Sequence, residues 1–269
     1  MICTPVPRAD KALDMRSRMR PAMGTFATIE SDRFPESLAL AASDAAFDVI
    51  DSIERLMHPT RAGSDLSRIN QARPGEVVDV GRSTWDVLAL AQRISAASGG
   101  VFDPCLATSE GCVADLELTS DHLVQLRRRV LIDLGGIAKG YAVDQALRCL
   151  REHGCENALV NIGGDMAALG ADRRVGARLR ERVLSLNLSN RALAVSDAQN
   201  ENGPPEHRGY YSRCAQPMRR TIAAVMAPNA AIADALTKCA LYCDDAEWTV
   251  LARQFDAVLI PYAREGWSG

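Results

Sequence analysis

Hydrophobic residues recur at helical spacing in several parts of the chain. The clearest stripe predicts a helix over residues 38–56, which ends near His58 and Pro59 because proline cannot continue a helix. The same spacing predicts further helices over residues 84–97, 143–150, 230–242 and 248–254.

Alternating or continuous apolar runs predict the strands. We expect them at residues 25–30, 130–133, 158–162, 182–188, 192–196, 222–226 and 257–260. The segments 60–75 and 197–219 are polar and predict loops.

Strands and helices mix without strict alternation, which favours an α+β fold. We expect a mixed, mostly antiparallel sheet core with flanking helices, arranged as two closely joined lobes. Residues 1–20 are expected to be a flexible polar leader, and residues 21–269 a single domain. With 269 residues, 47% of them hydrophobic, the chain is long enough to bury such a core.

Charge and composition exclude some classes of function. The net charge of −3 and the 5% aromatic content argue against a nucleic-acid-binding protein, which would show a basic stripe with stacking aromatics. No apolar run is long enough for a membrane span, and the first twenty residues lack a signal-peptide core. We therefore expect a cytoplasmic protein, or a periplasmic one if a leader precedes this sequence.

The most informative segment is 130–144, where an apolar run meets Gly135-Gly136 and then a helix with Lys139 in its first turn. Two glycines let the backbone approach a ligand, and a helix N-terminus attracts anions. A cation there opposes the helix dipole unless an anion lies beside it. The segment predicts a phosphate site; a tight turn with a solvated lysine is an equal alternative.

A second double glycine follows in Gly163-Gly164-Asp165. The strand, helix and strand between the two turns form one compact unit, so Asp133 and Asp165 should lie near the turns and accept hydrogen bonds from a nucleotide. Either aspartate could instead cap a turn. The third glycine of a dinucleotide-binding fingerprint is missing.

Six motifs occur in an order that resembles one known family. They are Met23-Gly24-Thr25, residues 64–70, Phe102-Asp103-Pro104, residues 133–144, residues 161–165 and residues 233–237. Together they span most of the chain and resemble the FAD:protein FMN transferase (ApbE) family.

The resemblance implies a magnesium-dependent enzyme that cleaves FAD and attaches FMN through a phosphoester bond to a threonine or serine of a target protein. Gly135 and Lys139 would serve the diphosphate of FAD. The Gly136 carbonyl, Asp234 and Thr237 would hold Mg²⁺.

By the same resemblance, Met23, Phe102, Asp103 and Asp133 would line the FAD pocket. Each has an ordinary structural alternative, since a methionine or phenylalanine beside a strand is often core.

Two positions depart from the family pattern. Lys238 stands where a metal-binding threonine is usual; it could pair with Asp234 at i, i+4 or hold a phosphate in place of a metal. Arg213 stands where a histidine base is usual, and arginine cannot act as a base but can stabilise phosphate charge. Arg213 and Lys139 are thus the catalytic candidates. The alternative function is a flavin-nucleotide-binding protein of the same fold with weak or no transferase activity.

Overall fold

A seven-stranded sheet forms the centre of the computed structural model, which describes residues 16–32, 34–198 and 217–261. In spatial order its strands are β1 (Arg16–Ala22), β2 (Thr25–Ser31), β6 (Ala158–Ile162), β7 (Asp165–Leu169), β10 (Ala192–Asp197), β11 (Ile222–Ala227) and β12 (Val258–Leu259). All pairs between them are antiparallel. The α+β class is confirmed, and among the described strands the sheet is antiparallel rather than mixed.

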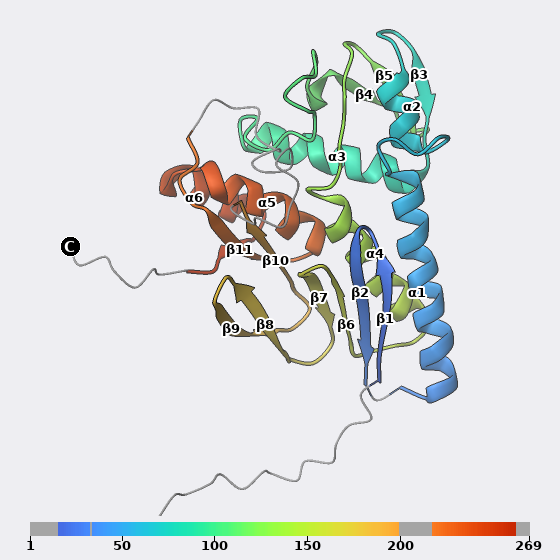
Figure 1. Cartoon of the computed structure of the whole chain (residues 1–269), viewed down its shortest axis with the longest axis vertical. Helices are drawn as coiled ribbons and strands as arrows, with labels where there is room; N and C mark the ends of the chain where they lie inside the picture. Colours follow the sequence, from blue (N-terminus) through green and yellow to red (C-terminus); the bar gives the residue numbers. More distant parts are fainter. Residues whose placement is uncertain (1–15, 33, 199–216, 262–269) are drawn as a thin grey trace, which may run out of the picture.

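Both faces of this sheet are covered (Figure 1). The helices α1 (Glu36–Leu56), α4 (Ala138–Glu152) and α5 (Ala230–Tyr242) pack on one face. The hairpin of β8 (Arg173–Leu179) and β9 (Arg182–Leu188) packs on the other. Successive side chains of β6 point to opposite faces of the sheet, so both faces carry apolar residues. Val160 belongs to the core on the helix side, and Leu159 belongs to the core on the hairpin side.

A smaller lobe lies at the C-terminal end of α1 (Figure 1). It contains α2 (Asp65–Gln71), α3 (Arg82–Ala97), the 3-10 helix η1 (Val113–Asp115) and a sheet ordered β3 (Val77–Asp79), β5 (Leu123–Leu126) and β4 (Leu116–Leu118). Leu88 and Val124 of this lobe share one hydrophobic cluster with Ile29 and Val160 of the large sheet. The expected two joined lobes are therefore present. The helix α6 (Asp245–Gln254) follows α5.

The strand expected at residues 130–133 is wrong, because the structure has only a single bridge there between Cys105 and Ile132. On one edge Leu131 and Asp133 pair with the backbone of residues 104–106, and on the other edge the Asn70 side chain takes the place of a strand partner. Its Oδ1 accepts from the Ile132 N–H at 2.7 Å, and its Nδ2 donates to the Ile132 carbonyl at 2.9 Å. The predicted loop at residues 60–75 likewise contains α2, which begins at a Ser64 cap.

Strand β1 begins at Arg16, within the segment for which the sequence predicts a leader. The inward face of β1 carries arginines rather than apolar residues, so its alternation does not look like a core strand. Arg18 forms an ion pair with Asp44 at 2.9 Å, and the Arg20 guanidinium lies 4.5 Å from the centre of the Phe47 ring. Residues 1–15 lie outside the described part of the chain.

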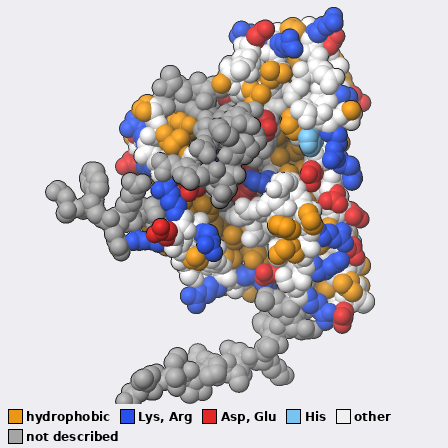
Figure 2. Space-filling model, in the orientation of Figure 1, with side chains coloured by type: hydrophobic (Ala, Val, Ile, Leu, Met, Phe, Trp, Pro, Cys, Tyr) orange, Lys and Arg blue, Asp and Glu red, His pale blue; other side chains and the backbone are white. Residues whose placement is uncertain are grey.

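Acidic and basic side chains are interspersed over the described surface drawn in Figure 2. Among the helices of the described residues, none has the length and apolar character needed to cross a bilayer.

Candidate active site

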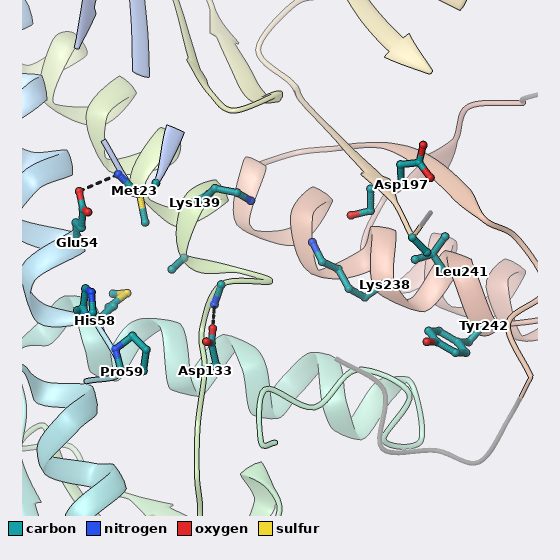
Figure 3. A pocket seen from close by; sticks show the side chains of 16 residues that line it. Met23, Glu54, His58, Pro59, Asp133, Lys139, Asp197, Lys238, Leu241 and Tyr242 are labelled. Atoms are coloured by element: carbon teal, nitrogen blue, oxygen red, sulfur yellow. Dashed lines mark hydrogen bonds between the residues drawn. The ribbon is translucent and has the colours of Figure 1, made fainter. Parts of the chain in front are cut away.

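A cavity of about 540 Å³ lies where the two lobes meet the start of α4. Its wall is contributed by the β1–β2 turn, the C-terminal end of α1, the segment entering α4, the end of β10 and the last turns of α5 (Figure 3). Met23, Asp133, Gly135 and Lys139 line it, as does Lys238. Five of the positions singled out in the sequence, spread over more than 200 residues, thus line one cavity.

Close packing of α4 against α5 brings these residues together. Gly140 makes the approach possible, because a Cβ at this position would lie 2.2 Å from the Ala230 carbonyl oxygen. Asp144 then fixes the start of α5, accepting hydrogen bonds from the backbone N–H groups of Ala230 and Ala231 at 2.7 and 2.9 Å. Lys139 of α4 consequently faces Lys238 of α5 across a short distance (Figure 3).

Two lysines and two aspartates form a charged cluster at this junction. Lys139 Nζ donates to Asp165 Oδ2 at 2.5 Å and lies 3.7 Å from Asp234 Oδ2. Lys238 Nζ contacts Asp234 Oδ1 and also donates to the Asp234 carbonyl oxygen at 3.0 Å. Both aspartates are buried, whereas both ammonium groups belong to residues that line the cavity. The lysines therefore present the positive side of the cluster to a ligand.

The two carboxyl groups of this cluster differ in their electrostatics. Burial, together with the neighbouring Asp234 carboxylate, raises the pKa of Asp165. Burial alone would also raise the pKa of Asp234, but the ammonium groups of Lys139 and Lys238 outweigh it and hold that pKa below its usual value. Asp234 therefore stays ionised, and protonation of Asp165 leaves the lysine charge less fully compensated.

The start of α4 suits an anion. Ile137, the residue before this fifteen-residue helix, makes no side-chain cap, and the positive end of the helix dipole faces the cavity. In its first turn the Ala138 N–H donates to the Leu134 carbonyl oxygen at 2.8 Å, and the Gly140 N–H approaches Asp234 Oδ2 at 3.4 Å. Asp133 lies beside it with its Oδ1 accepting from the Gly135 N–H at 2.7 Å (Figure 3). Gly136 is buried directly before the helix.

Met23 reaches the cavity from a tight turn. Met23 and Gly24 both have positive φ, at 51° and 73°, and join β1 to β2 in a two-residue hairpin loop. The Met23 N–H donates to Glu54 Oε2 at 2.8 Å (Figure 3). A left-handed methionine is uncommon, so this turn holds the side chain at the cavity wall at some cost in backbone energy.

Phe102 and Asp103 are not among the residues that line the cavity. Both are buried, and the Asp103 carboxylate accepts hydrogen bonds from the backbone N–H groups of Cys105 and Val113 at 2.9 and 3.2 Å. Asp103 therefore organises the loop between residues 103 and 113. Arg213 lies outside the described residues.

Other cavity residues have functional side chains that the sequence did not single out. Asp197 forms an ion pair with Arg180 at 3.1 Å. His58 lies in the wall, and its Nδ1 accepts from the backbone N–H groups of Thr60 and Arg61. Because Nδ1 is the acceptor, a neutral ring carries its hydrogen on Nε2. His58 looked only like a helix end in the sequence, and nothing local placed it beside residues 133–139.

Relatives of this chain are named for one activity. It is 27% identical over 186 residues to the FAD:protein FMN transferase of Treponema pallidum, covering 57% of this chain and 51% of that protein. It is 24% identical over 239 residues to the same-named protein of Haemophilus influenzae, covering 70% and 68%. The chain spans about half the length of the Treponema pallidum and Klebsiella pneumoniae relatives.

Solved structures show the same fold. The flavinyl transferase ApbE of Pseudomonas stutzeri superposes with a TM-score of 0.79 at 18% identity, covering 95% of this chain and 93% of that one. The ApbE protein of Thermotoga maritima gives a TM-score of 0.77 at 21% identity, covering 91% and 93%. A model of the ApbE family matches residues 23–260. With this match over most of its length, the chain belongs to the ApbE family.

Proposed function

We propose that this chain cleaves FAD and attaches the FMN part through a phosphoester bond to a threonine or serine hydroxyl of a target protein. The proposal is supported by membership of the ApbE family and by relatives named FAD:protein FMN transferase. FAD is then the substrate, and the target protein is the second substrate.

One observation carries this proposal: the ammonium groups of Lys139 and Lys238 meet at one cavity, next to the start of α4. Two cations and a helix N-terminus match the two charged phosphates of FAD. Apolar wall residues such as Met23, Met57 and Leu241 offer the kind of surface on which a flavin ring can lie.

The reaction exchanges one phosphorus–oxygen bond for another. The hydroxyl oxygen of the target bonds to the phosphorus of the FMN half, the bond from that phosphorus to the bridging oxygen breaks, and AMP leaves. The hydroxyl proton must pass to a base. Lys139 would offset the negative charge that spreads over the phosphate oxygens in the transition state. Arg213 stays a prediction for the same role.

The magnesium ion implied by the resemblance also stays a prediction, and the described residues do not fit it as arranged. The Asp234 carboxylate is already in contact with the Lys238 ammonium group. The Thr237 hydroxyl donates to the Asp234 carbonyl oxygen at 2.6 Å and shares a second hydrogen bond with Ser196 Oγ at 2.7 Å. Within the described ranges, no three His, Cys, Asp or Glu residues form a metal-binding group.

A labelling assay tests the transferase function. The protein is incubated with FAD and a domain that carries an FMN-acceptor threonine, and covalent flavin fluorescence is read on a denaturing gel. We expect a fluorescent acceptor. If FAD binds but the acceptor stays unlabelled, the alternative of a flavin-nucleotide-binding protein is supported instead.

Replacing Lys139 tests the phosphate role. We expect Lys139→Ala to weaken FAD binding by about 1–3 kcal/mol, the cost of losing a charge-assisted hydrogen bond. Flavin fluorescence quenching measures the affinity, and circular dichroism confirms the fold. Arg148→Ala is the matched control, since Arg148 is an exposed cation on the same helix. Equal FAD affinity in the wild type and Lys139→Ala would remove Lys139 from the site.

A further inference from the structure

Lysine is rare in this chain and is concentrated at the cavity. The sequence has 3 lysines against 28 arginines, and two of the three are Lys139 and Lys238. Arginine presents a broad planar fork, whereas lysine places a compact point charge with three donors at the end of a flexible stem. A chain that otherwise uses arginine thus places its compact cations where two buried carboxylates and a ligand cavity meet.

Lys238 occupies the position that an ion bound to Asp234 would need. Its Nζ contacts both the carboxylate and the main-chain carbonyl oxygen of Asp234, and the Lys238 side chain is 11% exposed. On the opposite side of Asp234, the Gly140 N–H approaches Oδ2 at 3.4 Å and Lys139 Nζ lies 3.7 Å away. A metal ion could replace these contacts to the carboxylate only by displacing a lysine ammonium group.

The charges of the cluster lead to the same conclusion. With both carboxylates ionised, Asp165 and Asp234 balance Lys139 and Lys238. A buried carboxylate needs a compensating charge, and here lysine supplies it on each side. Mg²⁺ prefers about six oxygen ligands in near-octahedral geometry, which this mixture of ammonium and carboxylate groups does not provide.

We propose that Lys238 is the built-in cation of the diphosphate subsite, so that FAD binds to this protein without a divalent metal. This inference rests on the proposed function, because it concerns how the same cavity holds the same substrate. Lys238 is held by Asp234 on one side and lines the cavity on the other, which places its charge where phosphate oxygens would lie.

FAD binding with and without metal tests the proposal. The affinity of the wild-type chain is measured by flavin fluorescence quenching, once in EDTA and once with millimolar Mg²⁺. We expect the two dissociation constants to agree within about twofold, since the positive charge is already in place. An affinity that falls tenfold or more in EDTA and returns with Mg²⁺ would overturn the inference and leave the proposed function intact. No FAD binding under either condition would overturn both.

In the Lys238→Thr variant we expect the opposite result, namely FAD affinity that depends on the metal. The substitution removes the ammonium group, uncovers Asp234 and adds a hydroxyl oxygen beside Thr237, which is the oxygen chemistry that Mg²⁺ accepts. We expect its FAD affinity to fall at least tenfold in EDTA and to recover with Mg²⁺. A Lys238→Thr variant that binds FAD as well as the wild type in EDTA would contradict the role of Lys238.

Two further measurements guard against a variant that does not fold. Lys238→Met keeps the aliphatic stem and leaves Asp234 beside Lys139, and we expect it to lose FAD affinity in EDTA. Titration of the wild type with Mn²⁺ alone, followed by electron paramagnetic resonance, should show no stoichiometric binding; one tightly bound ion per chain would overturn the inference. Arg148→Met is the control, because it removes an i, i+4 ion pair with Glu152 that is exposed on α4.

Discussion

The two double-glycine segments look alike in the sequence but serve different purposes in the structure. Gly163 and Gly164 have φ values of 60° and 103° and close the two-residue turn between β6 and β7. Gly135 and Gly136 are not among the described residues with positive φ; there the chain runs along the cavity into α4. A pair of glycines in the sequence therefore shows only that two side chains are absent, and by itself it does not predict a ligand site. The neighbouring residues decide between a turn and a ligand site.

The residue that distinguishes the α4 segment most sharply is Gly140. An added methyl group would lie 2.2 Å from a backbone oxygen of Ala230, and backbone cannot move aside without separating α4 from α5. We expect Gly140→Ala to lower the free energy of unfolding by about 3 kcal/mol or more. FAD affinity should fall with it, because Lys139 and Lys238 would no longer meet.

Urea denaturation and flavin quenching measure the two effects of this substitution. Arg151→Ala is the control, since it changes an exposed residue of the same helix. A Gly140→Ala protein of wild-type stability and affinity would show that α4 and α5 can tolerate a wider spacing, and the packing explanation of the site would be wrong.

A substitution in the β6–β7 turn should produce the contrasting result. Alanine at position 163 must adopt a left-handed conformation, which costs about 1–2 kcal/mol. We expect Gly163→Ala to lower stability by that amount and to leave FAD affinity unchanged, since Gly163 is not among the cavity-lining residues. The same two assays apply.

The Gly163 variant also needs its own control. Its new Cβ would lie 2.8 Å from Thr25 Cγ2, so part of the loss could come from this contact. Adding Thr25→Ser removes the methyl group and isolates the backbone effect. A loss of FAD affinity in the single variant would assign this turn to the ligand site and remove the contrast between the two segments.

The difference between local and long-range contacts also decides which parts of the fold could be predicted from the sequence. Helices with a continuous apolar stripe were predicted well, and α5 has the predicted bounds of 230–242. Strand β1 was missed because its inward face consists of arginines that pair with acidic residues of α1. The strand expected at residues 130–133 was wrong because the segment pairs with backbone only around Cys105, and the side chain of Asn70, sixty-two residues away, takes both backbone hydrogen bonds of Ile132.

For the site, the sequence indicated an anion near Lys139 from local rules about glycines and helix ends, and the cavity does lie there. It also raised the pairing of Lys238 with Asp234, which the structure contains. The pairing of Lys139 with Asp165 and the position of His58 depend on how distant segments pack. Spacing along the chain carries no information about such contacts.

The smallest expected effect concerns Asp144, which belongs to α4 and fixes the start of α5. Burial raises the pKa of its carboxyl group from 3.8 to about 7. The folded chain therefore keeps this proton at pH values where the unfolded chain has lost it, so the stabilisation is full below about pH 4 and is lost as pH rises towards 7. Asp165 shifts in the same direction, so only a difference between proteins isolates Asp144.

Asp144→Asn removes one titrating group and keeps one oxygen that can accept from Ala230 or Ala231. We expect the decline in unfolding free energy between pH 4.5 and 5.5 to be smaller in this variant, by about 1 kcal/mol. Urea denaturation of both proteins at the two pH values measures it. Parallel changes in the two proteins would mean that Asp144 is ionised throughout this range. The link between α4 and α5 would then be a charged cap on α5, and raising the pH would not weaken the junction on which the cavity depends.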